Sequence, residues 1–156
     1  MNFKIRDLCE EDIKFVSEVY SENIEALHGV AISLEDWKEC FFSNIDDDER
    51  NFIVLYNDEK AAWLKLNGLK NDRIYISMLV VRKNFQRRGV GSYAVRFTEK
   101  FAKDLKRNTI FILTTDDNIS AKCCYEKLDY VVDNRIRYAV GDGIERDGVV
   151  FRKEIT

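Results

Sequence analysis

The chain has 156 residues but no proline, only one histidine and four cysteines. Without proline no linker is visible, so we expect one domain covering residues 1–156. The cysteines form no C-x-x-C pair, and with a single histidine they argue against a zinc site, so we expect no bound metal. We interpret all four as buried, reduced thiols: Cys9, Cys40, Cys123 and Cys124.

Missing sequence patterns exclude further classes of protein. No apolar run approaches the roughly 20 residues of a membrane-spanning helix, and the charged start MNFKIRDLCEED lacks the apolar region of a signal peptide. We therefore expect a cytoplasmic protein with no membrane partner. The pattern G-x-x-x-x-G-K-[ST] is also missing, which excludes a nucleotide hydrolase of the P-loop type.

Charge is unevenly distributed along the chain, although the net charge is only −3. Residues 1–50 carry 14 acidic and 5 basic side chains, whereas residues 73–98 carry basic side chains and no acidic one. This pattern favours an anionic ligand near the basic segment and a cationic one near the acidic half, although charged helix faces are usually plain solvated surface. We expect no nucleic-acid partner, because the chain is acidic overall and few aromatic residues interleave with the basic ones.

Hydrophobic periodicity predicts both strands and helices. Apolar runs and alternating patterns predict strands at residues 3–6, 52–56, 61–66, 74–81, 109–114, 130–138 and 149–155. Apolar spacings of three and four predict helices at residues 10–24, 34–41, 91–106 and 119–128, and residues 44–50 are interpreted as a charged loop. The strands between residues 52 and 81 are expected to form an antiparallel meander. The strands at 74–81 and 109–114, separated by a helix, are expected to run parallel.

Residues 74–92 combine three features that together favour an anion-binding site. An apolar strand leads into a basic turn, and Gly89-Val90-Gly91-Ser92 opens the following helix. The first turn of a helix has unpaired backbone N–H groups, and the helix dipole favours negative charge there. A side chain at position 89 or 91 would obstruct a phosphate approaching these groups. We predict pyrophosphate binding here; the alternative is a basic surface turn whose glycines serve geometry alone.

Two motifs give the chain a resemblance to a known family. Residues 86–91, Gln-Arg-Arg-Gly-Val-Gly, match the pattern Q/R-x-x-G-x-G/A, and Asn118 is followed seven residues later by Tyr125. In these motifs and in the order of its expected elements, the chain resembles the GNAT superfamily of N-acetyltransferases. The resemblance implies an α/β (α+β) fold with a mixed sheet of about six or seven strands and about four flanking helices. Within that sheet it implies an antiparallel N-terminal meander and a central parallel pair that is splayed to hold acyl-CoA.

The resemblance also implies a function and the residues that perform it. Acetyl-CoA would donate its acetyl group to a primary amine of a small molecule or peptide, with Tyr125 as the general acid for the leaving thiolate. The alternative for Tyr125 is a tyrosine that only packs its helix onto the sheet. Arg82 and Lys83 are candidates for contacting the 3′-phosphate. The residues implied to bind acetyl-CoA are Leu79, Val80 and Val81, through their backbone, and Gln86, Arg87, Arg88, Gly89, Val90, Gly91, Ser92, Asn118 and Ala121.

The general base and the acceptor stay open. Several family members use a glutamate on the fourth or fifth strand as the base, but this chain has no acidic residue at 73–98 or 109–115. A noncatalytic acyl-CoA-binding sensor is therefore the alternative function, and a covalent mechanism through Cys123 or Cys124 is a further alternative. The acidic N-terminal half favours a cationic amine, and a homodimer is compatible with the sequence. The candidates for the base are Glu25, His28, Glu35, Tyr75 and Asp116.

Overall fold

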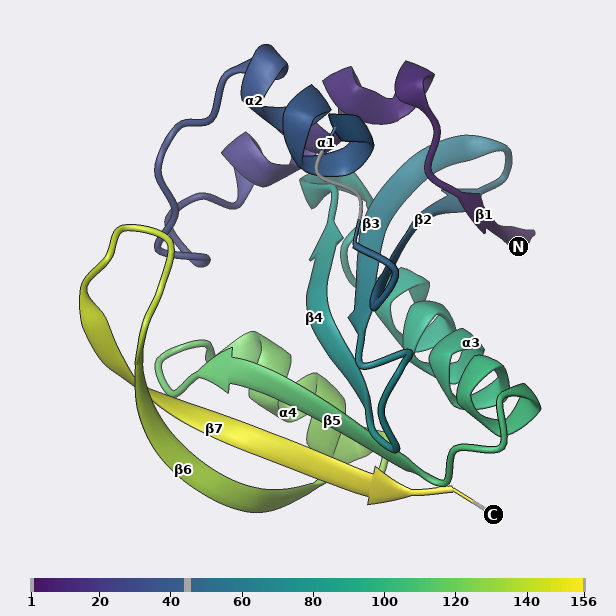
Figure 1. The fold of residues 1–156 in the computed structure, drawn as a ribbon, viewed down its shortest axis with the longest axis vertical. Coiled ribbons are helices and arrows are strands. Elements are labelled where there is room, and N and C mark those ends of the chain that lie inside the picture. Colours follow the sequence, from purple (N-terminus) through teal and green to yellow (C-terminus); the bar gives the residue numbers. More distant parts are fainter. Residues whose placement is uncertain (1, 44–45, 156) are drawn as a thin grey trace.

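A computed structural model describes residues 2–43 and 46–155 and contains a seven-stranded mixed sheet (Figure 1). The strand order is β1–β2–β3–β4–β5–β7–β6, and neighbouring strands are antiparallel except for the parallel pair β4–β5. The predicted mixed sheet with its antiparallel meander and central parallel pair is thus confirmed. The strands are β1 (Phe3–Asp7), β2 (Glu49–Tyr56), β3 (Glu59–Asn67), β4 (Ile74–Val81), β5 (Thr109–Thr115), β6 (Val131–Ala139) and β7 (Glu145–Glu154).

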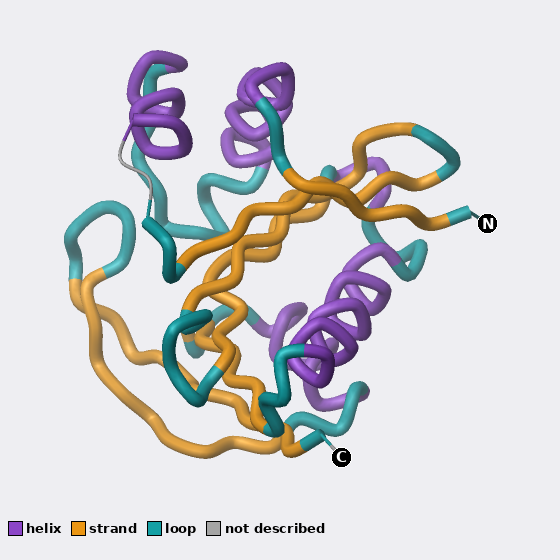
Figure 2. The backbone as a smooth tube through the Cα atoms, turned by 45° about the vertical axis from the view of Figure 1, so that its right-hand side comes forward, coloured by secondary structure: helices purple, strands orange, loops and turns teal. Residues whose placement is uncertain are grey.

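Helices cover both faces of the sheet (Figure 2). Helices α3 (Val90–Asp104) and α4 (Ile119–Lys127) pack on one face, and α1 (Ile13–Glu22) and α2 (Leu34–Lys38) pack on the other. None of the helices in the described part of the chain is long and apolar enough to cross a membrane. Short helical turns also occur at η1 (Glu10–Asp12), η2 (Glu39–Ser43) and η3 (Lys83–Phe85).

Each face of the sheet has its own hydrophobic core. Successive side chains of a strand point to opposite faces, so Trp63 of β3 joins the core beneath α1 and α2 while Leu64 joins the core beneath α3 and α4. Two leucines at the ends of helices belong to neither core. Leu34 and Leu105 are 51% and 40% exposed, because Leu34 is the first residue of α2 and Leu105 follows the last residue of α3.

Strands β2 and β7 begin earlier than the apolar patterns predict. β2 starts at Glu49, inside the expected charged loop, of which residues 44 and 45 lie outside the described residues. Glu49 pairs with Asn67 across the β2–β3 ladder, and its carboxylate lies 3.2 Å from Lys65 Nζ. β7 starts at Glu145, where it pairs with the exposed edge strand β6. Ladder pairing therefore extends both strands through polar residues that carry no apolar signal.

A β-bulge at Ser77 lies where β4 leaves β5. Lys65 of β3 pairs with Met78, and the next residue, Leu66, pairs with Ile76, so Ser77 is the extra residue on β4. A bulge bends its strand and increases the local twist. Parallel pairing with β5 ends at Ile76, one residue before the bulge, and Figure 1 shows the two strands diverging beyond it. The predicted splay is present, and the bulge provides a local cause for it.

The four cysteines are free thiols, but the expectation that all are buried is wrong. Cys9, Cys40 and Cys123 are exposed. Only Cys124 is partly buried, packed against the core beneath α4. A cysteine is small enough to sit on a polar helix face without exposing much apolar surface, so composition alone gives no reliable placement.

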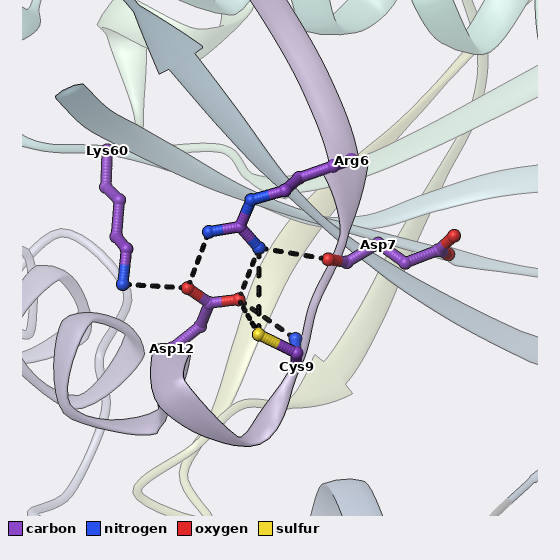
Figure 3. Close-up of polar contacts among 5 residues, drawn as sticks. All are labelled: Arg6, Asp7, Cys9, Asp12 and Lys60. Atoms are coloured by element: carbon purple, nitrogen blue, oxygen red, sulfur yellow. Dashed lines mark hydrogen bonds and ion pairs between the residues drawn. The ribbon is translucent and has the colours of Figure 1, made fainter. Parts of the chain in front are cut away.

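An ion cluster around the buried Asp12 ties the N-terminal strand to the start of α1 (Figure 3). Asp12 is fully buried and accepts hydrogen bonds from the Arg6 guanidinium at 2.7 and 2.9 Å, while Lys60 Nζ lies 2.8 Å from its Oδ1. The backbone N–H of Cys9 adds a further hydrogen bond at 2.9 Å. Burial alone would raise the pKa of the Asp12 carboxyl, but these donors outweigh it and hold the pKa well below its usual value.

Candidate functional site

The turn before α3 presents unpaired backbone donors, as the sequence predicts. Gly89 is the N-cap of α3 with φ +84°, and Arg87 is also left-handed with φ +64°. The N–H of Tyr93 makes the first hydrogen bond into the helix, to the Gly89 carbonyl at 3.0 Å. The N–H groups of the three preceding residues, Val90, Gly91 and Ser92, precede this bond and are the orphan donors of the first turn. These donors and the helix dipole make the turn suited to a phosphate group.

The basic side chains around this turn differ in their availability. Arg82 lies 3.3 Å from both Glu18 and Glu22 of α1, so its charge is already paired. Arg88 lies over the Phe85 ring, with its guanidinium carbon 5.8 Å from the ring centroid. Within residues 2–43 and 46–155, neither Lys83 nor Arg87 forms an ion pair, which leaves these two as the stronger candidates for phosphate contacts.

Gln86 and Val81, both predicted to bind the acyl donor, already form hydrogen bonds within the protein. The Gln86 amide nitrogen donates to the Val81 carbonyl at 3.1 Å and to Asn23 Oδ1 at 3.2 Å. The Asn23 amide nitrogen also donates to the Val81 carbonyl at 3.2 Å. The side chains of Gln86 and Asn23 thus hold the turn against the end of α1. A ligand could use the Val81 carbonyl only by displacing these two side chains. Val80 points its buried side chain into the core beneath α1.

A cavity of about 360 Å³ occupies the gap between the diverging strands β4 and β5. Four predicted site residues line it: Leu79 from β4, and Asn118, Ala121 and Tyr125 from α4 and its N-cap. The α1–α2 connection and the β6–β7 connection close the other side. The remaining lining residues are Ala26, Leu27, Asn67, Tyr75, Ile76, Ser77, Met78, Ile112, Leu113, Thr114, Thr115, Tyr138, Val140 and Gly141.

Tyr125 lies at the wall of this cavity and also packs into the core. It is 7% exposed, and its ring forms an edge-to-face contact with Phe151 at a centroid distance of 5.8 Å. Its hydroxyl makes no hydrogen bond to any described residue. Burial raises the pKa of the Tyr125 phenol well above its usual value, with a smaller contribution from Cys124. The phenol is therefore protonated at neutral pH, and its packing does not prevent it from facing a ligand.

Asn118 is the N-cap of α4 as well as a residue of the cavity wall. Its Oδ1 accepts a hydrogen bond from the Ala121 N–H at 3.2 Å. The Ala121 N–H is consequently satisfied by the cap, so Ala121 offers a ligand its small side chain rather than a free donor. The Asn118 amide nitrogen has no partner among the described residues, which leaves it available to a ligand in the cavity.

The five candidates for the general base differ in their exposure and in their contacts. Glu25 and Glu35 are exposed, and Asp116 is paired with Lys122 and Arg135 at 2.9 and 3.1 Å. Tyr75 lines the cavity. His28, in the α1–α2 connection, bonds a carboxylate that sequence reasoning did not select, because Asp117 is 89 residues away and no local pattern links the two. In the described part of the chain, no group of three His, Cys, Asp or Glu side chains could hold a metal ion.

Comparison with known proteins places this geometry in a family. The family model described as "Acetyltransferase (GNAT) family" matches residues 13–130. An uncharacterized N-acetyltransferase of Lactobacillus delbrueckii subsp. lactis is 23% identical over 92% of this chain and 93% of its own length.

Solved structures with low sequence identity share the fold. The ribosomal-protein-S18-alanine N-acetyltransferase of Escherichia coli superposes with a TM-score of 0.74 at 20% identity, over 99% of this chain and 95% of its own. A ribosomal L7/L12 alpha-N-protein acetyltransferase, solved in complex with coenzyme A, superposes with a TM-score of 0.83 at 15% identity, over 99% and 95%.

Proposed function

Because this chain belongs to the acetyltransferase (GNAT) family, we propose that it transfers the acetyl group of acetyl-CoA to a primary amine by direct attack of that amine. The observation that carries the proposal is the cavity between β4 and β5, which has Tyr125 and Asn118 in its wall. The cavity follows the bulge of β4, and the same strand leads through a short turn into the unpaired N–H groups of α3. One strand thus connects the proposed phosphate-binding turn to the cavity.

Each part of acetyl-CoA has a matching part of the protein. The pyrophosphate would accept hydrogen bonds from the first turn of α3, with Arg87 and Lys83 adding positive charge. The pantetheine arm would run along β4 from Leu79, where the strand no longer pairs with β5. The thioester would then lie in the cavity beside Tyr125 and Asn118.

Tyr125 is proposed as the general acid. Attack of the amine nitrogen on the thioester carbonyl forms a C–N bond and a tetrahedral intermediate, and collapse breaks the C–S bond and releases a thiolate. The Tyr125 hydroxyl gives its proton to that sulfur. Because burial disfavours the phenolate, the phenol keeps its proton until the thiolate forms and is reprotonated afterwards.

The alternatives are less well supported. Burial raises the pKa of the Cys124 thiol, which lowers its thiolate fraction and disfavours it as a nucleophile, while Cys123 points to solvent. A noncatalytic acyl-CoA sensor agrees with the lack of a carboxylate in the cavity lining, but membership of an acetyltransferase family argues against it. The acceptor is proposed to be a primary amine of a small molecule or a peptide. Glu18 and Glu22, which helped to suggest a cationic acceptor, are paired with Arg82.

Binding and turnover test this proposal in sequence. Acetyl-CoA should raise the melting temperature, and an amine panel that includes peptide N-termini should release free CoA. Tyr125→Phe should bind acetyl-CoA normally but lose about 10²- to 10⁴-fold in kcat. Tyr138→Phe is the matched control, because Tyr138 lines the same cavity. This variant should keep most of the wild-type activity. Unchanged kcat in Tyr125→Phe would remove its role as acid, and binding without turnover of any amine would favour the sensor.

A further inference from the structure

The cavity lacks a group that could take a proton from an ammonium ion at neutral pH. Its titratable lining residues are the three tyrosines Tyr75, Tyr125 and Tyr138, and no carboxylate or imidazole belongs to its described lining. Tyrosines are protonated at neutral pH and cannot serve as this base without strong activation. An amine acceptor arrives largely as an ammonium ion, so the proposed reaction needs a base at the rim of the cavity.

His28 and Asp117 lie together at that rim. His28 Nε2 is 2.8 Å from Asp117 Oδ2, and the His28 side chain is 20% exposed. His28 directly follows Leu27, and Asp117 directly precedes Asn118. Leu27 and Asn118 line the cavity, whereas His28 and Asp117 do not. The two therefore join the α1–α2 connection to the start of α4 beside the cavity.

The backbone of His28 is held in an unusual conformation. Its φ is +50°, in the left-handed region that residues other than glycine seldom occupy. The His28 carbonyl accepts a hydrogen bond from the Asp142 N–H of the β6–β7 connection at 2.9 Å. The two connections pack tightly, since a Cβ on Gly141 would lie 3.2 Å from the His28 carbonyl oxygen. A strained backbone fixed by two other segments orients the ring more firmly than an ordinary surface loop would.

On this arrangement, and resting on the proposed function, we infer that His28 is the general base and Asp117 its positioning residue. Asp117 accepts the Nε2–H and so leaves the lone pair on Nδ1, which faces no acceptor or donor among the described residues. Nδ1 takes a proton from the ammonium ion, directly or through one water, and the neutral amine then attacks the thioester. Asp117 stabilises the resulting imidazolium, as a carboxylate does in other carboxylate–histidine pairs.

The protons of the whole reaction balance. The ammonium ion loses its first proton to His28, which returns it to solvent. The second proton leaves the nitrogen after the C–N bond forms and passes through solvent to the Tyr125 phenolate, which has given its own proton to the leaving thiolate. One proton per turnover therefore reaches solvent, and neither residue changes its net state.

Other charged and polar groups surround His28, and they constrain the test. Asp142 is bonded by Arg146 at 2.7 and 2.8 Å, so its charge is largely compensated. Burial and the charge of Asp117 raise the pKa of the Tyr138 phenol. The Tyr20 hydroxyl lies against the glycines at 29 and 141. Among these groups, the carboxylate of Asp117 is the one that contacts the imidazole.

A tautomer measurement tests the pair without any turnover. The chain has one histidine, so its imidazole gives a single set of ¹⁵N resonances. We expect the neutral ring to carry its proton on Nε2, and we expect Asp117→Asn to weaken that preference. A neutral ring protonated on Nδ1 would overturn the proposal, because Nδ1 could not then accept a proton.

Kinetics with the amine that gives most free CoA provide the second test. Asparagine tolerates the left-handed backbone, so His28→Asn keeps the conformation of the connection while it removes the proton acceptor. We expect kcat/KM to fall about 10²- to 10⁴-fold, with the pH dependence changed and acetyl-CoA affinity retained. Asp104→Asn is the control, since Asp104 is an exposed carboxylate at the end of α3 that pairs with Lys100, and it should keep the wild-type pH profile. A wild-type profile in His28→Asn would overturn the base alone, whereas a wild-type enzyme that acetylates no amine would overturn the proposed function itself.

Discussion

Replacing Gly91 by alanine separates the two explanations for the glycines before and within α3. If the glycines serve geometry alone, alanine at this position should be harmless. Gly91 is helical with no positive φ, and an added Cβ would meet only the Val81 side chain, at 4.0 Å. The folded protein therefore accepts a methyl group here without strain. Any loss of ligand affinity must then come from contact between the methyl group and the bound ligand.

The expected effects on stability and on binding have opposite signs. Alanine in place of a helical glycine stabilises by about 0.5–1 kcal/mol, which corresponds to a rise of about 1–4 °C in Tm for a chain of this length. A methyl group beside the N–H groups of the first turn would push a phosphate away and remove at least one charge-assisted hydrogen bond. Such a bond contributes about 1.5–3 kcal/mol, so acetyl-CoA affinity should fall about 10- to 100-fold.

Thermal unfolding without ligand and calorimetric titration with acetyl-CoA measure the two effects separately. Gly143→Ala is the control for backbone strain, because Gly143 has φ +79° and no neighbour within 4 Å of an added Cβ. It should lose about 1 kcal/mol of stability and bind acetyl-CoA normally. Gly89→Ala, with φ +84°, should lose both stability and affinity. If Gly91→Ala binds acetyl-CoA with wild-type affinity, the proposed pyrophosphate contact is wrong.

Two further substitutions test the ion cluster and the basic turn. Asp12→Asn should cost about 2 kcal/mol in urea unfolding, because a buried amide replaces the carboxylate that accepts charge-assisted hydrogen bonds from Arg6 and Lys60. Since the folded pKa of Asp12 lies below its unfolded value of 3.8, its contribution is complete above that pH and should decline as the pH falls further, a decline that Asp12→Asn should lack. Arg87→Ser should weaken acetyl-CoA binding about tenfold and reduce its salt dependence, whereas Arg96→Ser, on the body of α3, should change neither.

The parts of the fold that the sequence predicts well depend on local signals. The helix start at Gly89 follows from residues that are adjacent in the chain, and the buried strand at 109–115 is recognisable from its own apolar run. The bulge at Ser77 is different. Its position depends on how Lys65 and Leu66 of another strand pair with β4, and Ser77 itself carries no signal for it.

The parts that the sequence misses depend on contacts between distant residues. Asp12 is indistinguishable in the sequence from its neighbours Glu10 and Glu11, yet it alone is buried, because only its side chain meets Arg6 and Lys60. Likewise, the availability of Arg87 rather than Arg82 for a phosphate depends on where α1 places its carboxylates, which no local pattern encodes.

The same distinction separates the two sides of the cleft. The proposed donor side is built from one continuous segment, β4 to α3, whose geometry is fixed by the bulge and the left-handed turn at Gly89. The proposed acceptor side is built from two connections that meet through the hydrogen bond between His28 and Asp142. Substitutions at residues 25–33 or 140–144 should therefore change which amine reacts while leaving acetyl-CoA affinity unchanged. The opposite result, a loss of acetyl-CoA affinity, would mean that the two sides are not independent.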